Sequence, residues 1–370
     1  MRPETIAIHL PGIRREGALS PPIHLSTTYE FGGTDEGISE FDYIRDDNPN
    51  VADLETRLAA LDCGEGAVTF ASGMAAGTAL LQTLPARAKV IFHRDLYSGF
   101  QKLVKNLFPQ WNLVSEFADL RDSGALEKAI TPEVELIWFE TPSNPGLELV
   151  DIETIVRVAA TVNARVVVDG TFATSALQQP LNWGADVVLH SATKYFGGHS
   201  DVQGGALIVR QDEELVESLR KVRSITGGVL SPFNAYMVSR GLMSLHCRIA
   251  KHCENALAIA HLLSQHPKIS RVHYPFLPSN PDIALAKKQM SAGGGMVSME
   301  VAGGREAALT VASRVKLFVN ATSLGGVESL IQHRFSPERV GTIVPESMLR
   351  LSVGLEHIED LKEDLLQALG

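Results

Sequence analysis

A lysine and an aspartate end two neighbouring apolar segments, in an arrangement that suits one particular cofactor. Lys194 closes the polar run 190–194, which follows the apolar stretch 185–189, and Asp169 ends the apolar run 165–169. Open α/β sheets place their ligands at the carboxyl ends of their strands, so we expect the amine and the carboxylate at one edge. Pyridoxal phosphate (PLP) forms a Schiff base with a lysine and pairs its ring nitrogen with an acid. The two residues therefore predict a catalytic PLP site.

Two polar segments could hold the phosphate of such a cofactor. The small-residue segment 71–76 follows a predicted strand and opens a helix, where backbone N–H groups and the helix dipole bind anions. Taken alone, such a turn is more often only a tight connection. Ser191 and Thr193 flank Lys194, and their hydroxyls could complete the phosphate site or be ordinary loop residues.

Three further side chains could contact the cofactor or the substrate, although each residue type also has a common structural role. Tyr97 follows a strand end, where its ring can stack on a planar cofactor or be a half-buried loop aromatic. Asn144 lies between prolines that would hold it for hydrogen bonding, although Asn-Pro also occurs in turns. Arg350 lies in an apolar run, and its guanidinium suits a substrate carboxylate. In isolation a structural salt bridge is its more common role.

The elements that must position these residues indicate a mostly parallel α/β sheet. Short apolar runs alternate with helical stretches, and most are continuous, as in strands that are buried on both faces. These runs cover residues 67–70, 89–92, 136–139, 165–169, 187–189 and 206–209. A helix is expected before the first of them, with Asp53 as its N-cap and Gly64 as its stop.

The chain is expected to form an arm and two domains. Residues 1–40 are rich in Pro and Gly and indicate an extended arm, which lies on a neighbouring subunit or forms a surface loop. Residues 41–228 form the large PLP-binding domain. Residues 229–370 form a smaller α+β domain, with a long helix over 234–263, strands over 296–301 and 349–353, and a closing helix over 359–369.

The composition excludes several classes of protein. Hydrophobic residues make up 45% and charged residues 21%, as in ordinary globular proteins, and the net charge is -10. An acidic chain without a Lys/Arg cluster is a poor candidate for binding nucleic acid or membranes. Three cysteines without Cys-x-x-Cys spacing and a start unlike a signal peptide predict a cytoplasmic location. The scattered histidines predict no metal site.

Several motifs together resemble the Cys/Met-metabolism family of PLP enzymes, and the resemblance covers nearly the whole chain. The most specific are DVVLHSATKY at 186–195 and GGHSDV at 197–202. The others are YIR at 43–45, SGM at 72–74, ETPSNP at 140–145, SLGG at 323–326 and LRLSVG at 349–354. So many motifs in the family's order imply the fold of type I PLP enzymes, which resembles aspartate aminotransferase.

The resemblance also implies roles for the cofactor-binding residues. Lys194 would be the Schiff-base residue, Asp169 the partner of the pyridinium nitrogen, and Tyr97 the stacking ring that assists proton transfer. The phosphate would be held by Gly73, Met74, Ser191 and Thr193.

Other implied roles concern the substrate and the assembly. Asn144, Ser323 and Arg350 would orient the cofactor oxygen and the substrate carboxylate. Tyr43 and Arg45 would reach the phosphate in the neighbouring subunit of an active dimer. Two such dimers would form the tetramer typical of the family.

The chain departs from the family's pattern in four places. Gly170 replaces a common Asn after the aspartate, and Tyr97-Ser98-Gly99-Phe100 replaces Tyr-Gly-Gly-Thr. Thr322 stands where many cystathionine γ-lyases and γ-synthases have Glu, which matches the distal amine of cystathionine. The stretch 333–347 also looks short in this comparison, which indicates an altered substrate.

The expected function is a PLP-dependent transsulfuration enzyme of the cystathionine γ-lyase or γ-synthase type. Lys194 would remove the Cα proton, with Asp169 ionised near the usual carboxyl pKa of about 4. Methionine γ-lyase, cystathionine β-lyase and O-acyl-homoserine sulfhydrylase are the alternatives within the family. A nicotinamide-dependent dehydrogenase is disfavoured because no Gly-x-Gly-x-x-Gly follows the first strand. A non-catalytic PLP-fold binding protein is disfavoured because both reactive residues are present.

Overall fold

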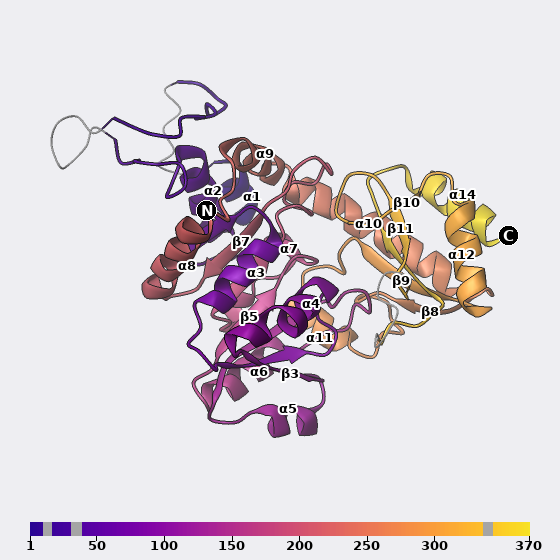
Figure 1. Cartoon of the computed structure of the whole chain (residues 1–370). Helices are drawn as coiled ribbons and strands as arrows, with labels where there is room; N and C mark the ends of the chain where they lie inside the picture. The colour runs from indigo at the N-terminus through magenta and orange to yellow at the C-terminus, as the bar shows by residue number, and fades with distance from the viewer. Residues whose placement is uncertain (10–16, 31–38, 336–342) are drawn as a thin grey trace.

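The computed structural model describes residues 1–9, 17–30, 39–335 and 343–370, and it contains two sheets (Figure 1). The first has seven strands and the second has five. The larger sheet comes first in the chain, and the smaller one follows with its own helices. This is the α/β fold with a smaller second part that the sequence predicts.

The larger sheet is mostly parallel. Its strands are β1 (Gly66–Phe70), β2 (Lys89–His93), β3 (Val114–Ala118), β4 (Val134–Glu140), β5 (Arg165–Asp169), β6 (Val187–His190) and β7 (Gly205–Val209). Their spatial order is β1-β7-β6-β5-β4-β2-β3, and β7 runs antiparallel to both of its neighbours. Strands β4, β5 and β6 are parallel, so their carboxyl ends lie at one edge.

Helices cover both faces of this sheet (Figure 1). They are α1 (Pro3–Ile8), α2 (Pro49–Asp62), α3 (Gly73–Gln82), α4 (Ser98–Asn106), α5 (Ser123–Ala129), α6 (Ile152–Ala160), α7 (Thr174–Leu177) and α8 (Glu213–Thr226). Two 3₁₀ turns, η1 (Phe108–Trp111) and η2 (Pro180–Trp183), lie between a helix and the strand that follows it. In the described part of the chain, no helix has the length and apolar character needed to cross a membrane.

The strands form a continuous core because successive side chains enter different layers. In β5, Val166 and Val168 belong to the cluster beneath α2 and α6, whereas Val167 belongs to the cluster beneath α3 and α8. Both sets are buried, which explains why these strands are continuously apolar in sequence.

The smaller part contains the five-stranded sheet. Its elements are α9 (Pro232–Leu242), α10 (Leu245–Ser264), β8 (Ile269–His273), α11 (Ile283–Gln289), β9 (Met296–Val301), α12 (Gly304–Arg314), β10 (Val319–Asn320), β11 (Leu330–His333), β12 (Met348–Ser352) and α14 (Ile358–Leu369). The strand order is β10-β11-β12-β9-β8. Because α9 packs in the core of the larger part, the division at residue 228 stays a prediction.

The structure differs from the prediction at two helices and at one strand that was not predicted. The predicted helix over 234–263 is two helices, which Met243 and Ser244 separate. The helix expected from Asp53 begins earlier, at Pro49, because the Asn48 side chain accepts from the N–H of Asn50 and caps it. It ends before the predicted stop, since Cys63 adopts a left-handed conformation. Strand β3 was not predicted, because it is a partly exposed edge strand.

The predicted arm contains a short helix of its own. Helix α1 packs against α2, and Ala7 is buried in the core between them. Arg57 of α2 donates to the carbonyl oxygen of Ala7 over 2.7 Å. Residues 10–16 and 31–38 of the arm lie outside the described residues, so its course over a neighbouring subunit stays a prediction.

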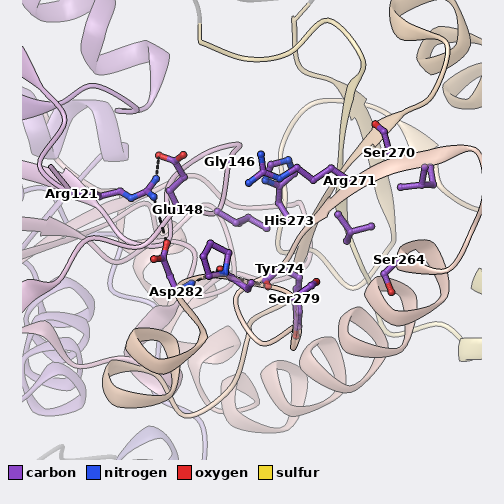
Figure 2. A pocket seen from close by; sticks show the side chains of 15 residues that line it. Arg121, Gly146, Glu148, Ser264, Ser270, Arg271, His273, Tyr274, Ser279 and Asp282 are labelled. Atoms are coloured by element: carbon purple, nitrogen blue, oxygen red, sulfur yellow. Dashed lines mark hydrogen bonds and ion pairs between the residues drawn. The ribbon is translucent and has the colours of Figure 1, made fainter.

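An ionic cluster connects the two parts of the molecule away from the sheet edge described above. Arg121 lies 2.6 Å from Glu148 and 3.6 Å from Asp282, which is the residue before α11 (Figure 2). The cluster lines a cavity of about 300 Å³ beside edge strand β8. All three side chains are partly exposed, so each ion pair contributes at most about 1 kcal/mol. The cluster therefore acts as a weak connection between loops.

Candidate active site

The carboxyl ends of β4, β5 and β6 border a cavity of about 510 Å³, a size suited to a cofactor and a small substrate. Ten of the twelve predicted site residues line it. They are Gly73, Met74, Tyr97, Asn144, Asp169, Ser191, Thr193, Lys194, Ser323 and Arg350. Residues from both sheets thus meet in one place, as the sequence predicts for an active site.

The amine of Lys194 is held inside this cavity. Its Nζ donates a hydrogen bond to Oγ of Ser323 over 2.7 Å. Burial lowers the pKa of Lys194 to about 8, and the positive charge of Arg350 acts in the same direction. A substantial fraction of the amine is therefore neutral near pH 8, and the neutral form is both nucleophile and base.

This pKa predicts how the cofactor-free enzyme takes up PLP. The neutral amine of Lys194 would be the nucleophile toward the aldehyde of PLP, so the uptake rate should rise with pH as Lys194 loses its proton. We expect the midpoint near pH 8 instead of the ordinary 10.5. Stopped-flow absorbance of the apoenzyme mixed with PLP between pH 6.5 and 10 measures it. A rate that still climbs steeply between pH 9 and 10 would contradict the depressed pKa.

Asp169 lies at the end of β5 and is buried. Its Oδ1 accepts from the N–H of Thr171 over 3.0 Å. Burial raises the pKa of Asp169, while the hydrogen bonds from Thr171 and the charge of His190 lower it. Burial outweighs these contacts in the free protein, and the predicted ionisation of Asp169 opposite the ring nitrogen stays a prediction. A cationic ring nitrogen against this carboxylate would favour its ionised form.

Glu140 forms a second carboxyl group beside Asp169 that the sequence analysis did not assign. The two residues are direct partners in the β4–β5 pairing. Oε1 of Glu140 accepts from the N–H of Tyr97 over 2.8 Å. Burial and then the neighbouring Asp169 raise the pKa of Glu140 well above its usual range, which favours the neutral acid. The sequence feature that could have identified Glu140 is a carboxylate at the end of a predicted buried strand.

The amino end of α3 meets the segment after β6 in a tight cradle. Ser72 caps the helix by accepting from the N–H of Ala75 over 3.1 Å. A Cβ atom added at Gly73 would lie 3.0 Å from Cβ of Ser191, so only glycine leaves this space open. The helix end, with Ser191 opposite, provides N–H and hydroxyl donors for a phosphate.

Thr193 has a structural contact besides its place in the cavity lining. Its hydroxyl donates to the carbonyl oxygen of Gly204 and accepts from the N–H of the same residue, both over 3.1 Å. This pair fixes the segment that carries Lys194 against the loop before β7. The predicted contact of Thr193 with the phosphate stays a prediction.

Arg350 joins the three segments that surround the substrate side of the cavity. It lies on β12 and donates to Oδ1 of Asn144 over 2.9 Å, to the carbonyl oxygen of Ser323 over 2.8 Å and to Oε1 of Gln332 over 3.1 Å. Ser323 has a positive φ of 87°, a conformation that costs about 1–3 kcal/mol and is frequent at functional sites. The Arg350 contact helps to hold it.

The position of Arg350 predicts a specific kinetic defect. Replacing it by alanine removes the cation for the substrate carboxylate and leaves Lys194 and Asp169 in place. We expect the KM for amino acid substrates to rise about 10- to 100-fold, while PLP remains bound. Steady-state kinetics and the absorbance of bound PLP report the two effects separately. An unchanged KM would exclude the carboxylate role.

Tyr97 borders the cavity beside Phe100, the position at which the chain departs from the family motif. Its ring meets Phe100 edge to face, with centroids 6.0 Å apart. Phe100 is the departure from the family motif, and its ring packs against Trp138 with centroids 4.7 Å apart. A Cβ atom at Gly77 would lie 2.3 Å from the Phe100 ring. The altered position therefore fills a gap against α3 behind Tyr97.

Two predicted site residues lie outside the cavity. Tyr43 is 42% exposed, and the Arg45 guanidinium lies 5.3 Å from the centroid of its ring. Arg45 donates to the carbonyl oxygen of Ser224 over 2.9 Å. Neither residue lines the site of its own chain, and their role in a neighbouring subunit stays a prediction.

Gln332 and Arg334 also line the cavity, and the sequence analysis missed both. Gln332 lies on β11 directly opposite Arg350 of β12. Gln332 lies on β11 and Arg334 lies directly after its end, so their polar side chains beside a predicted motif were a usable signal. The pairing of β11 with β12 was not visible in sequence.

The residues of this cavity fit PLP. The amine of Lys194 and the carboxylate of Asp169 both line the cavity, and so does the glycine cradle at the start of α3, which would provide donors for a phosphate. When bound, PLP supplies an aldehyde that links to an amine and a ring that accepts electrons from the substrate. Lys194, Asp169, Gly73 and Ser191 are the residues that would hold it.

The comparisons with known proteins agree with this site. The family profile described as Cys/Met metabolism PLP-dependent enzyme matches residues 4–370. The cystathionine gamma-synthase of Mycobacterium tuberculosis (strain H37Rv) is 45% identical over 377 residues, which cover 100% of this chain and 97% of that protein. The cystathionine beta-lyase of Coxiella burnetii is 40% identical over 364 residues, which cover 95% of this chain and 93% of that protein.

A solved structure supports the same assignment. The cystathionine gamma synthase of Xanthomonas oryzae pv. oryzae, in complex with aminoacrylate and cysteine, has a TM-score of 0.95 and 38% identity, and the match covers 100% of this chain and 98% of that chain. The predicted family, type I PLP fold, enzyme class and cofactor are confirmed. The chain belongs to the Cys/Met-metabolism family of PLP-dependent enzymes and is a transsulfuration enzyme.

Proposed function

We propose that this enzyme is a cystathionine γ-synthase, which joins the sulfur of cysteine to the γ carbon of an activated homoserine. The observation that carries the chemistry is the Lys194 amine, with its lowered pKa, held by Ser323 in a cavity that Arg350 borders. The full-length relative at 45% identity supports the choice of γ-replacement among the reactions of the family.

Each of the cavity's polar side chains has a separate role in this reaction. Arg350 and Asn144 bind and orient the α-carboxylate of the substrate. The neutral amine of Lys194 takes the proton from Cα and then a proton from Cβ, since both carbons face the same base. Ser323 positions this amine, and Tyr97 assists the proton transfers.

The exchange at the γ carbon balances without an oxidant or a reductant. The bond between Cγ and the ester oxygen breaks, and the acid leaves as its anion. The Cγ–S bond forms with the sulfur of cysteine, and the thiol proton is released. A depressed pKa of Lys194 suits this sequence, because the same amine must accept and return protons near neutral pH.

Product analysis tests the proposal. Purified holoenzyme is incubated with cysteine and the acetyl, succinyl and phosphate esters of homoserine, and in parallel with cystathionine, methionine or cysteine alone. Cystathionine formed from an ester and cysteine supports the synthase. The release of 2-oxobutyrate from cystathionine or methionine in preference to synthesis would favour a γ-lyase, and pyruvate with homocysteine would favour a β-lyase.

We also propose that Tyr43 and Arg45 complete the site of a neighbouring subunit, in a dimer that pairs into a tetramer in the cytoplasm. Mixed refolding tests the shared site. Arg45→Ala and Lys194→Ala chains, each nearly inactive, should regain activity together, because one hybrid site then contains both native residues. Additive, unrecovered activity would show that each chain builds its site alone.

A further inference from the structure

A buried ionic pair lies behind the strand that leads to Lys194, and it has no role in the reaction proposed above. His190 is the last residue of β6 and is 2% exposed, and Asp62 is the last residue of α2 and is 0% exposed. Nε2 of His190 lies 3.2 Å from both carboxylate oxygens of Asp62. Two ionisable groups in contact and away from solvent are costly to keep, so their position calls for an explanation.

The position of Asp62 favours a positive charge on His190. A carboxylate at the carboxyl end of a helix faces the negative end of the helix dipole, and burial removes the water that would otherwise stabilise it. Among the described residues, His190 is the only basic side chain within ion-pair distance of Asp62. The protonated imidazole is therefore the group that can balance this carboxylate.

The other side of the His190 ring packs against Gly170. A Cβ atom added at Gly170 would lie 2.9 Å from Cε1 and 3.5 Å from Nδ1 of His190, so the ring occupies the space that any side chain would need. Nδ1 is buried and has no hydrogen-bond partner in the described part of the chain. The backbone of Gly170 lies outside the left-handed region, so it is the contact with His190 that excludes a side chain here. This glycine replaces the Asn that is common in the family.

This contact places His190 directly behind Asp169. Gly170 follows Asp169 in the chain, and its N–H donates to the carbonyl oxygen of Leu189 over 2.9 Å, which extends the β5–β6 pairing. Asp169 and Leu189 line the cavity, whereas Gly170 and His190 lie outside its lining. Because successive side chains of a strand point to opposite faces, one layer of backbone separates the imidazole from the carboxylate.

The positive end of the buried pair faces Asp169. Nδ1 of the His190 ring lies towards Gly170, and Nε2 lies towards Asp62. A charge on the ring is therefore closer to Asp169 than the balancing charge of Asp62 is. The charge of His190 lowers the pKa of Asp169, which opposes the effect of burial, and solvent screens a buried charge only weakly.

We propose that His190 is a positioning residue: protonated and held by Asp62, it keeps Asp169 ionised opposite the ring nitrogen of PLP, and Gly170 makes room for its ring. The inference concerns the cofactor, so it holds for each of the reactions considered above, and it rests on the proposed contact between Asp169 and the ring nitrogen. An ionised Asp169 keeps that nitrogen protonated, which is the form in which the ring best accepts electrons.

The protonation of His190 is tested in the cofactor-free enzyme. The protein is labelled with nitrogen-15 in its histidine rings, and the NMR signal that disappears in His190→Gln is assigned to His190. We expect an imidazolium at pH 8, where an ordinary histidine with a pKa of about 6.5 is neutral. In Asp62→Asn the signal should change to that of a neutral ring. A neutral His190 in the wild type would overturn the proposal.

The ring nitrogen of the cofactor reports the effect on Asp169. In wild type loaded with PLP that carries nitrogen-15 in its ring, the NMR shift should be that of a protonated nitrogen. His190→Gln keeps a donor for Asp62 but has no charge, so the shift should move towards that of a neutral ring. The Kd of PLP should rise about tenfold. Thermal unfolding of each apoenzyme shows whether the variant is folded.

Gly170 offers a second variant that leaves both charged residues in place. Gly170→Ala adds one methyl group, which should displace the His190 ring and change the shift and the Kd in the same direction. In a His190→Gln background the alanine should change the Kd by less than about twofold, because both substitutions act through one contact. His93→Gln is the matched control, since His93 is also buried at the end of a strand of this sheet, and it should leave the ring nitrogen protonated.

The results that overturn this inference are distinct from those that overturn the role of Asp169. If His190→Gln and wild type bind PLP equally, with a protonated ring nitrogen in both, His190 has only a structural role. The same conclusion follows if His93→Gln changes the shift as much as His190→Gln does. If Asp169→Asn also leaves the ring nitrogen protonated and the affinity unchanged, the contact of Asp169 with the ring is itself wrong.

Discussion

Replacing Lys194 with alanine is expected to remove the visible absorption band of enzyme-bound PLP and to lower turnover by more than about 10³-fold. The side chain supplies the covalent link to the cofactor and the base for both proton removals, and a positioned base alone contributes about 10²–10⁴-fold. The hydrogen bond to Ser323, over 2.7 Å, holds this amine in place in the cavity. Absorbance spectra and turnover of the purified variant measure both effects.

A second lysine provides the matched control. Lys102 lines the same cavity from helix α4 but is exposed. Lys102→Ala should therefore retain the visible band. Lys194→Arg keeps a positive charge and should lose the band, because a guanidinium does not form the link. If Lys194→Ala kept an unchanged band and Lys102→Ala lost it, the cofactor-linking residue would have to be reassigned.

Replacing Asp169 with asparagine is expected to weaken PLP binding strongly and to lower turnover by about 10²–10⁴-fold. The amide keeps the shape and can still accept the Thr171 hydrogen bond, so the fold should persist. The charge opposite the ring nitrogen is lost, and removing one partner of a buried ion pair costs about 3–5 kcal/mol. Equilibrium dialysis of PLP and thermal unfolding of the apoenzyme distinguish these effects.

The control for this substitution is a carboxylate outside the cavity. Asp186 pairs with Arg210 at 3.0 Å, and both side chains are partly exposed. Asp186→Asn should leave PLP affinity nearly unchanged. Equal affinity for PLP in Asp169→Asn and wild type would contradict the proposed ionic contact with the ring.

The sequence predicted the larger sheet well because its strands are buried on both faces. Continuous apolar runs such as 165–169 correspond to β5 and its neighbours, and the polar residues that end them lie at the cavity. The edge strand β3 was missed, since it is partly exposed along its whole length. The break between α9 and α10 was also missed, because Met243 and Ser244 carry no strong helix-ending signal.

In the stretch 333–347 the sequence did not predict which residues line the cavity. The resemblance to the family predicted a short stretch there, and residues 336–342 lie outside the described part. Arg334, at the start of this stretch, lines the cavity. A change in loop length predicted only an altered substrate, whereas the structure shows that Arg334 and Arg350 both donate to Oε1 of Gln332 in the cavity.

The amino-acid sequence by itself determined the fold class and the family, and it predicted the reactive lysine and its acid partner. These features depend on local apolar runs and on motifs a few residues long. Only the tertiary structure decided which distant residues meet: Glu140 with Asp169, Lys194 with Ser323, and Gln332 with two arginines. It also decided the pKa of each group. Strand pairing and burial arise from packing between segments far apart in the chain, and local sequence does not record either of them.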